Sequence, residues 1–336
     1  MYEVRPFGTL RGQDVPLIQL TDGDISVELL PYGAAIRSIW APDREGRATD
    51  ICLGYDTLEE YRDRDACFGG TIGRCANRIG GASFTVDGTE YRLTANEGAN
   101  TLHGGGEGFH KKLWRYACEE NSVTFTLDSP DGEEGFPGSL RAEVTYTLQS
   151  STLTIEYRAK SDKTTVVNLT NHAYYNLAGH NGGPVHDHGL RVRAERYTPA
   201  GEGNVPTGQI ADVAGTVLDL RQGAWLGERL DRPALAASRG YDHNFVLNGA
   251  PAATLWCPRT GIALDMTTTL PGMQLYTAGF LTPRKGKGGA LYGPAHAVCL
   301  EPQFFPDAVH HENFPSPLLR AGEAYRQSIA CRFYVK

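Results

Sequence analysis

Apolar and polar residues alternate along two consecutive segments near the middle of the chain. In residues 140–148 an apolar side chain occupies every second position, and residues 153–159 repeat the pattern. Successive side chains of a β-strand point to opposite faces, so this alternation predicts two strands that each bury one face. The polar residues Gln149, Ser150 and Ser151 lie between the two segments. We therefore predict an antiparallel hairpin over these residues.

Similar strand signals recur along the chain, whereas helical periodicity is rare. Residues 83–93 are predicted to form a second hairpin that turns at Asp87-Gly88, a dipeptide that favours tight turns. Only residues 57–62 and 224–230 are predicted to be helical. Further strands are predicted at residues 25–30, 123–127, 166–169, 190–194, 244–247, 254–256, 263–268 and 327–334.

Many strands without alternating helices are typical of antiparallel sheets packed as a sandwich or closed as a barrel. The 40 glycines among 336 residues, with no three-residue repeat, fit a chain with many tight turns. No Pro- or Ser-rich linker and no internal repeat divides the sequence. We therefore expect an all-β protein in which residues 1–336 form a single domain.

The composition indicates which classes of partner and which cell compartment suit the protein. A formal net charge of −7 disfavours nucleic acid or an anionic membrane as the main partner. The N-terminus lacks the pattern of a signal peptide, and no apolar stretch approaches the roughly 18 residues that span a bilayer. The seven cysteines are scattered without a CxxC pair, which favours reduced thiols. We expect a cytoplasmic protein.

Two segments place histidines among turn-forming, polar or aromatic residues. His103 precedes three glycines, where a backbone can pass close to a ligand, although an incidental surface histidine is the alternative. In residues 168–177, strand alternation places Asn168, Thr170 and His172 on one face. Hydrogen-bonding groups beside aromatic rings suit a sugar, whose hydroxyls need donors and acceptors. The alternative is an exposed polar face.

Glu301 lies in a mostly apolar, proline-flanked strand within residues 298–307. Desolvating a carboxylate is costly, so an isolated one is rarely buried. Burial would raise the pKa of Glu301, which makes a carboxylate an effective general base near neutral pH. The alternative is a strand glutamate held by a salt bridge.

No other cluster predicts a cofactor, a metal or a covalent nucleophile. The histidine pairs at 186 and 188 and at 310 and 311 lack a Cys or carboxylate at a convincing ligand spacing. Residues 286–289 contain only a fragment of a phosphate-binding loop. There is no GxSxG, and no cysteine has an obvious activating neighbour. We expect neither a cofactor nor a metal.

Short motifs follow one another along most of the chain: GRCANRI at 73–79, NEG at 96–98, LHGG at 102–105, NLTNH at 168–172, RYTP at 196–199, VPTG at 205–208, GYDHNF at 240–245, PGMQLYT at 271–277, LEPQ at 300–303 and PDA at 306–308. In this order they resemble the successive signatures of the aldose 1-epimerases, or galactose mutarotases. Several independent motifs in order are more specific than any one of them. Two positions depart from the pattern. Tyr175 stands where Phe is common, and His310, which the resemblance places at the rim of the site, stands where Asn is frequent.

The resemblance implies a large antiparallel β-sandwich and an isomerase that interconverts the α and β anomers of free aldohexoses such as D-galactose and D-glucose. By motif, Glu301 would be the general base and His172 the general acid, and no cofactor would be needed. The partner would be a small aldose, and the protein a monomer or a weak homodimer. The side chains implied to contact the sugar are Asn77, Arg78, His103, Tyr174, Asp242 and Gln274, with Arg78 also expected to hold Asp242.

Two other functions remain open on the same fold. A hexose-6-phosphate 1-epimerase would need a basic cluster for the phosphate, for which Arg74, Arg78, Lys285 and Lys287 are candidates. A non-catalytic sugar-binding or sensing protein would not need a paired acid and base, so the presence of both favours an enzyme.

Overall fold

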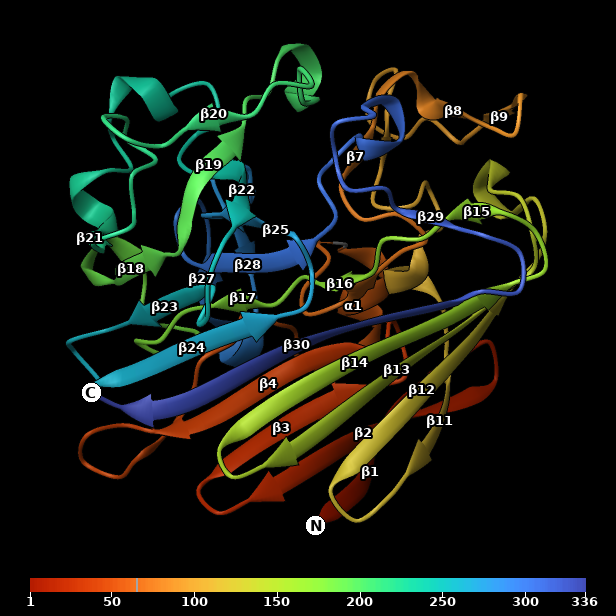
Figure 1. Ribbon diagram of the computed structural model, residues 1–336. Helices are drawn as coiled ribbons and strands as arrows, with labels where there is room; N and C mark the ends of the chain where they lie inside the picture. Colours follow the sequence, from red (N-terminus) through yellow and green to blue (C-terminus); the bar gives the residue numbers. More distant parts are fainter. Residues whose placement is uncertain (65) are drawn as a thin grey trace.

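The computed structural model describes residues 1–64 and 66–336, which are mostly strands (Figure 1). The chain begins with a five-stranded antiparallel sheet whose strands lie in sequence order, because a short connection joins each strand to the next. This confirms the all-β class. The strands are β1 (Tyr2–Leu10), β2 (Gln13–Asp22), β3 (Ile25–Leu30), β4 (Ala35–Pro42) and β5 (Ala48–Asp50).

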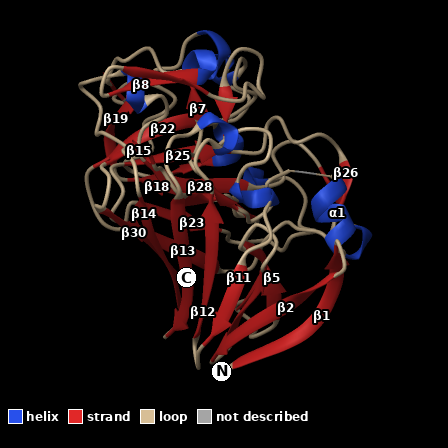
Figure 2. Cartoon of the chain, turned by 90° about the vertical axis from the view of Figure 1, so that its right-hand side faces the viewer, coloured by secondary structure: helices blue, strands red, loops and turns tan. Residues whose placement is uncertain are grey.

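A nine-stranded antiparallel sheet packs face to face with the first one, and Figure 2 shows both from the side. Val27 and Ile39 of the first sheet and Phe125 and Ile155 of the second are buried in one shared hydrophobic core. The predicted large β-sandwich is therefore confirmed. In spatial order the nine strands are β11 (Arg115–Cys118), β12 (Ser122–Ser129), β13 (Leu140–Gln149), β14 (Thr152–Ser161), β30 (Ala324–Val335), β24 (Ile262–Thr268), β23 (Ala253–Trp256), β18 (Gly189–Val192) and β21 (Ala224–Trp225).

The hairpin predicted from residue alternation is formed by β13 and β14, which pair along their whole length. Ser150 and Ser151 make its two-residue turn, both with positive φ. The apolar positions of both strands are buried, and most of the intervening positions are partly or fully exposed. The second predicted hairpin is also present, as β8 (Ser83–Val86) and β9 (Thr89–Arg92).

A third, six-stranded sheet lies above the sandwich in the view of Figure 1. Its neighbouring strands come from distant parts of the sequence, so side chains that are far apart along the chain meet on one of its faces. In spatial order they are β17 (Tyr174–Tyr175), β28 (Val298–Gln303), β25 (Gly272–Tyr276), β22 (Asp242–Leu247), β19 (Ala194–Thr198) and β20 (Ala211–Asp212).

Four two-residue strand pairs complete the described fold. One of them, β6 with β16, contacts strand β28 of the third sheet. The pairs are β6 (Thr71–Ile72) with β16 (Thr170–Asn171), β7 (Arg78–Ile79) with β10 (Thr101–Leu102), β15 (Thr165–Val166) with β29 (Leu318–Leu319), and β26 (Arg284–Lys285) with β27 (Leu291–Tyr292).

The helix predicted at residues 57–62 is confirmed as α1 (Leu58–Asp63). A capping box starts it. The Thr57 side chain accepts the Glu60 backbone N–H at 3.3 Å, and the Glu60 carboxylate accepts the Thr57 N–H at 3.3 Å. No helix in the described part of the chain is both long and apolar enough to cross a lipid bilayer.

Two sequence predictions are wrong. The helix predicted at 224–230 is instead the edge strand β21 followed by one 3₁₀ turn, η6 (Leu226–Glu228), because pairing with β18 commits the backbone groups that a helix would use. The strand predicted at 166–169 stops at Val166. Beyond it, Asn168 exchanges backbone hydrogen bonds with Arg74 and Ala76.

Several strands were not predicted, among them β1, β2 and β4 of the first sheet. Strand β2 could have been predicted, because the segment between Gly12 and Gly23 contains the apolar residues Val15, Leu17 and Leu20, which are buried in the structure.

Candidate active site

A cavity of about 380 Å³ opens beside the six-stranded sheet and is within the usual size of a small-molecule site. All eight residues proposed from the sequence line it, although they lie between positions 77 and 301 of the chain. They are Asn77, Arg78, His103, His172, Tyr174, Asp242, Gln274 and Glu301.

Glu301 is an almost fully buried carboxylate on β28, with 2% of its surface exposed. Within the described residues its Oε2 atom has no hydrogen-bond partner, and it lies 3.6 Å from Nε2 of His172. Burial raises the pKa of Glu301 well above its ordinary value, and the negative charge of Asp242 raises it further, against the opposing charge of Arg78. Glu301 is thus a buried strand glutamate whose ion-pair contact is with the imidazole of His172, a cavity residue.

His172 directly follows β16 and is fixed by its backbone, since its N–H donates to Gly70 O at 2.9 Å. Its ring stacks on that of Tyr174, with centroids 4.8 Å apart and planes within 7°. The ring of Tyr276 meets it edge-on at 6.2 Å. The histidine is thus held between two aromatic walls with Nε2 toward Glu301, and the polar face considered from the sequence is buried rather than exposed.

His103 presents a second imidazole to the cavity, 5.4 Å from the His172 ring. Its Nδ1 accepts the backbone N–H of Asn77 at 3.2 Å, so the neutral ring carries its proton on Nε2. The glycines after it serve packing. A Cβ on Gly104, where φ is +85°, would lie 2.0 Å from the carbonyl oxygen of Gly73.

Asp242 and Gln274 form a polar pair on neighbouring strands. Gln274 donates from Nε2 to Asp242 Oδ1 at 2.6 Å, and its own Oε1 has no partner among the described residues. Gln274 also lies directly opposite Glu301 in the β25–β28 ladder. The arrangement leaves a buried amide oxygen and a buried carboxylate ready to accept hydrogen bonds from hydroxyl groups, which would offset the cost of leaving them unpaired.

Arg78 contacts a different carboxylate from the one expected. Its Nε and Nη2 donate to the two oxygens of Glu97 at 2.6 and 2.7 Å, a two-point ion pair. The hydrogen bond to Asp242 comes from Gln274, while Arg78 acts on Asp242 through its charge and lowers a carboxyl pKa that burial raises. Glu97 belongs to the NEG motif at 96–98, so the motif could have identified it as a site residue from the sequence.

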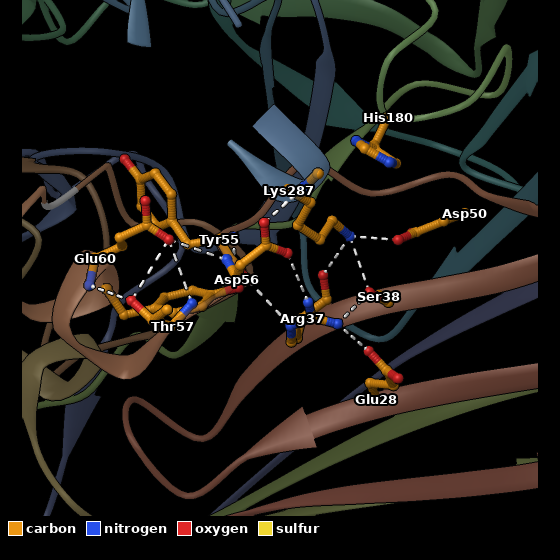
Figure 3. Close-up of polar contacts among 12 residues, drawn as sticks. Glu28, Arg37, Ser38, Asp50, Tyr55, Asp56, Thr57, Glu60, His180 and Lys287 are labelled. Carbon is orange, nitrogen blue, oxygen red and sulfur yellow. Dashed lines mark hydrogen bonds and ion pairs between the residues drawn. The ribbon is translucent and has the colours of Figure 1, made fainter. Parts of the chain in front are cut away.

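Three of the four cations considered for a phosphate already pair with other groups of the protein, although Arg78 itself lines the cavity. Arg74 is 2% exposed and donates to Ser129 and to nearby carbonyl oxygens. Lys287 is buried against Asp50 and Ser38, as Figure 3 shows. Arg78 is paired with Glu97, and Lys285 is exposed outside the cavity lining. This finding disfavours the phosphate-binding alternative.

A fifth cation, Arg284, lines the cavity together with Arg78. Its nitrogens donate to the Tyr55 hydroxyl at 3.0 Å, to Arg64 O at 3.0 Å, and to the backbone and side-chain oxygens of Thr282. These hydrogen bonds hold the Arg284 side chain in place in the wall of the cavity.

A metal-ligand set is present that sequence spacing did not reveal. Ligand atoms of His103, His172 and Glu301 all lie within 4.8 Å of one another, and two imidazoles with a carboxylate are a known zinc donor set. Because His103 Nδ1 accepts the Asn77 N–H, a metal would have to bind His103 through Nε2 and displace the proton there. That the protein works without a metal stays a prediction.

Sequence reasoning left out several lining residues. Glu97, Leu102 and Tyr276 lie in the NEG, LHGG and PGMQLYT motifs and could have been found from them, whereas the others lie outside the motifs. His310, expected at the rim, is not in the lining and instead hydrogen-bonds Asp307 at 2.6 Å. The additional lining residues are Ala66, Cys67, Glu97, Leu102, Asn204, Tyr276, Phe280, Leu281 and Arg284.

The family model described as aldose 1-epimerase matches residues 16–332. The chain belongs to the aldose 1-epimerase family. It is 43% identical over 327 residues to galactose mutarotase from Bos taurus, covering 96% of this chain and 94% of that protein. It is 37% identical to aldose 1-epimerase from Escherichia coli K12, covering 94% of each.

A crystal structure of an aldose epimerase homologue from C. elegans superposes on the chain with a TM-score of 0.88 at 33% identity, covering 95% of this chain and 98% of that one. Galactose 1-epimerase from Lactobacillus acidophilus gives the same TM-score at 28% identity, covering 100% and 99%. The aldose 1-epimerase family therefore accounts for both the motifs and the fold of this chain.

Proposed function

We propose that this protein is an aldose 1-epimerase, an isomerase that interconverts the α and β anomers of free aldohexoses such as D-galactose and D-glucose. The observation that carries the proposal is the buried carboxylate of Glu301, whose Oε2 has no hydrogen-bond partner among the described residues and lies 3.6 Å from Nε2 of His172 in the cavity. The names of the relatives support the same activity.

The proposed reaction needs two proton transfers on one bound sugar. Glu301 takes the proton of the anomeric hydroxyl while protonated His172 gives one to the ring oxygen, and the bond between C1 and the ring oxygen breaks. The open-chain aldehyde then turns about its C1–C2 bond. On closure from the other face, the two residues exchange roles, so protons and electrons balance without a redox partner.

The remaining side chains are assigned to binding. Gln274 Oε1 accepts a sugar hydroxyl, because its Nε2 is already used by Asp242. His103 donates from Nε2, and Asn77, Arg78 and Asp242 supply further polar contacts around the ring. Tyr174 supports His172 by stacking on it. With Glu301 as base and His172 as acid, these assignments give a role to every cavity residue named from the sequence.

The biological setting is proposed on composition and packing. Residues 1–336 act as one domain, since one buried core includes residues from Ile18 to Phe333. The protein works in the cytoplasm as a monomer or weak homodimer. Buried thiols at Cys52, Cys75 and Cys331 fit a reducing compartment.

Polarimetry tests the activity directly. Freshly dissolved α-D-galactose, and separately α-D-glucose, should approach their final rotation faster with a catalytic amount of protein, and the ratio of the two rates measures preference. Excess EDTA should leave both rates unchanged if no metal is needed. Absence of acceleration on any free aldose, with acceleration on hexose 6-phosphate, would replace this proposal with the phosphate alternative.

A further inference from the structure

One wall of the cavity is a loop that follows the third sheet and is fastened to the first one. The segment from Ala278 to Tyr292 leaves β25, and its Phe280, Leu281 and Arg284 line the cavity. Three residues beyond Arg284, the chain enters the single turn η8 (Lys287–Gly289) and then returns through β27. The position of the wall therefore depends on what holds η8.

Lys287 holds η8 by inserting its side chain into the first sheet (Figure 3). It is 4% exposed, and its ammonium group donates to Arg37 O at 2.9 Å, Ser38 Oγ at 2.9 Å and Asp50 Oδ2 at 2.5 Å. All three ammonium protons thus have an acceptor. The acceptors lie on β4 and β5, about 240 residues earlier in the chain.

Backbone contacts fix the same turn a second time. The Lys287 N–H donates to Gly54 O at 3.1 Å, and the Gly288 N–H donates to Asp56 Oδ2 at 2.7 Å. Gly286 lies flat on the Tyr292 ring, where a Cβ would approach within 1.8 Å. These contacts hold the η8 turn in position against Gly54, Asp56 and the Tyr292 ring.

The wall and its anchor share supporting residues. Tyr55, next to Gly54 in sequence, accepts a hydrogen bond from Arg284 at 3.0 Å and donates to Arg64 O at 2.6 Å. Asp56 binds both the Arg37 guanidinium at 3.2 Å and the η8 turn. A shift of η8 would therefore move Arg284 and the cavity wall with it.

A buried ion pair is a costly way to add stability, because an apolar pair of similar volume often stabilises as well. What a buried pair adds is a fixed geometry, since each charge tolerates only a placement where its partner reaches it. Burial lowers the pKa of Lys287 and the carboxylate of Asp50 opposes that effect, so the two groups depend on each other.

We propose that Lys287, paired with Asp50, is a positioning residue that fixes the 280–284 wall of the cavity and thereby sets how tightly the aldose is held. Lys287 touches no substrate and acts through the loop it anchors. The inference rests on the proposed function, because it assumes that the cavity binds an aldose.

The test uses the full-length protein and a double variant that removes both charges. Lys287→Met alone leaves the Asp50 charge buried and threatens folding, whereas Lys287→Met with Asp50→Asn leaves no unpaired charge and keeps an acceptor for the Cys52 N–H. Lys285→Met is the matched control, since Lys285 lies exposed on the same loop outside the cavity lining.

For the folded double variant we expect KM for the preferred aldose to rise about tenfold or more, with kcat within about threefold of wild type. The reason is that a displaced cavity wall binds the sugar less tightly. The pH profile of kcat should be unchanged, because Glu301 and His172 keep their contacts. Amide hydrogen exchange should accelerate in residues 278–289 only. Lys285→Met should change none of these quantities.

A folded double variant with wild-type KM and wild-type exchange in residues 278–289 would overturn the positioning role. Loss of kcat without a rise in KM would overturn it as well. The exchange measurement needs no activity, so it separates this inference from the proposed function: a wild-type protein inactive on every free aldose would refute the function, while the exchange result would still decide the anchor.

Discussion

Replacing Glu301 by glutamine should destroy catalysis and at the same time stabilise the protein. Glutamine has nearly the same shape and keeps a carbonyl oxygen beside His172, but it cannot take a proton from the anomeric hydroxyl. A positioned general base contributes about 10²–10⁴-fold to rate. At 1.36 kcal/mol per factor of ten this corresponds to about 2.7–5.4 kcal/mol of transition-state stabilisation.

The expected gain in stability follows from the environment of Glu301. Burial and the charge of Asp242 raise its pKa in the folded protein, so the folded state binds this proton more tightly than the unfolded state. The free energy of unfolding of the wild type therefore falls as pH rises from the ordinary carboxyl pKa through the raised one. Glu301→Gln removes that fall, and its unfolding midpoint should exceed that of wild type at neutral pH and converge with it in acid.

The assays are polarimetry for turnover, titration calorimetry with D-galactose for binding, and thermal unfolding across pH for stability. Glu143→Gln is the control, because Glu143 lies on β13, pairs with Arg141 at 3.2 Å and does not line the cavity. The reasoning would be refuted if folded Glu301→Gln kept more than about one tenth of the wild-type rate, given the size expected for a lost base. A midpoint below that of wild type at neutral pH would contradict the burial argument.

Three further substitutions test other parts of the structure. Glu97→Gln weakens the two-point ion pair that orients Arg78, so KM should rise about tenfold, as expected for the loss of a charge-assisted contact, with a smaller change in kcat; an unchanged KM would exclude this role. Thr57→Ala removes the capping box of α1 and should lower the free energy of unfolding by about 0.5–2 kcal/mol in urea titrations, and no loss would show that the cap is unimportant. Arg326 lies directly opposite Arg158 in the β14–β30 ladder, whereas Arg158 also faces Glu143 on β13, so Arg326→Thr should raise the free energy of unfolding by about 0.2–1 kcal/mol at low salt, with the gain disappearing at high salt; destabilisation at low salt would contradict the repulsion.

The sequence predicted best where the structural cause is local. The alternation in residues 140–159 is a property of neighbouring side chains, and β13 and β14 follow it closely. Thr57 and Glu60 encode the start of α1 in the same way, through contacts within one turn. Prediction failed at Ala224–Trp225, because a partner strand more than thirty residues away competes with the local helical preference there.

The candidate site shows the same division. Motifs contain seven of the eight proposed lining residues, Tyr174 lies two positions after one of them, and the apolar surroundings of Glu301 indicated its burial. The sequence did not indicate that Glu97 rather than Asp242 would receive the Arg78 guanidinium, or that Lys287 would be withdrawn into the first sheet. Those pairings join residues whose distance along the chain carries no information about their distance in space.

The amino-acid sequence by itself thus determined the strand-rich class, the hairpins, the family and the residue types of the site, because periodicity, turn chemistry and motifs are written in neighbouring positions. Only the tertiary structure decided which of these residues face each other. The order of strands in the third sheet places Gln274 opposite Glu301, and the β6–β16 pair places His172 beside them. Burial within that arrangement then raises the pKa of Glu301, an effect that no isolated segment of the chain could produce.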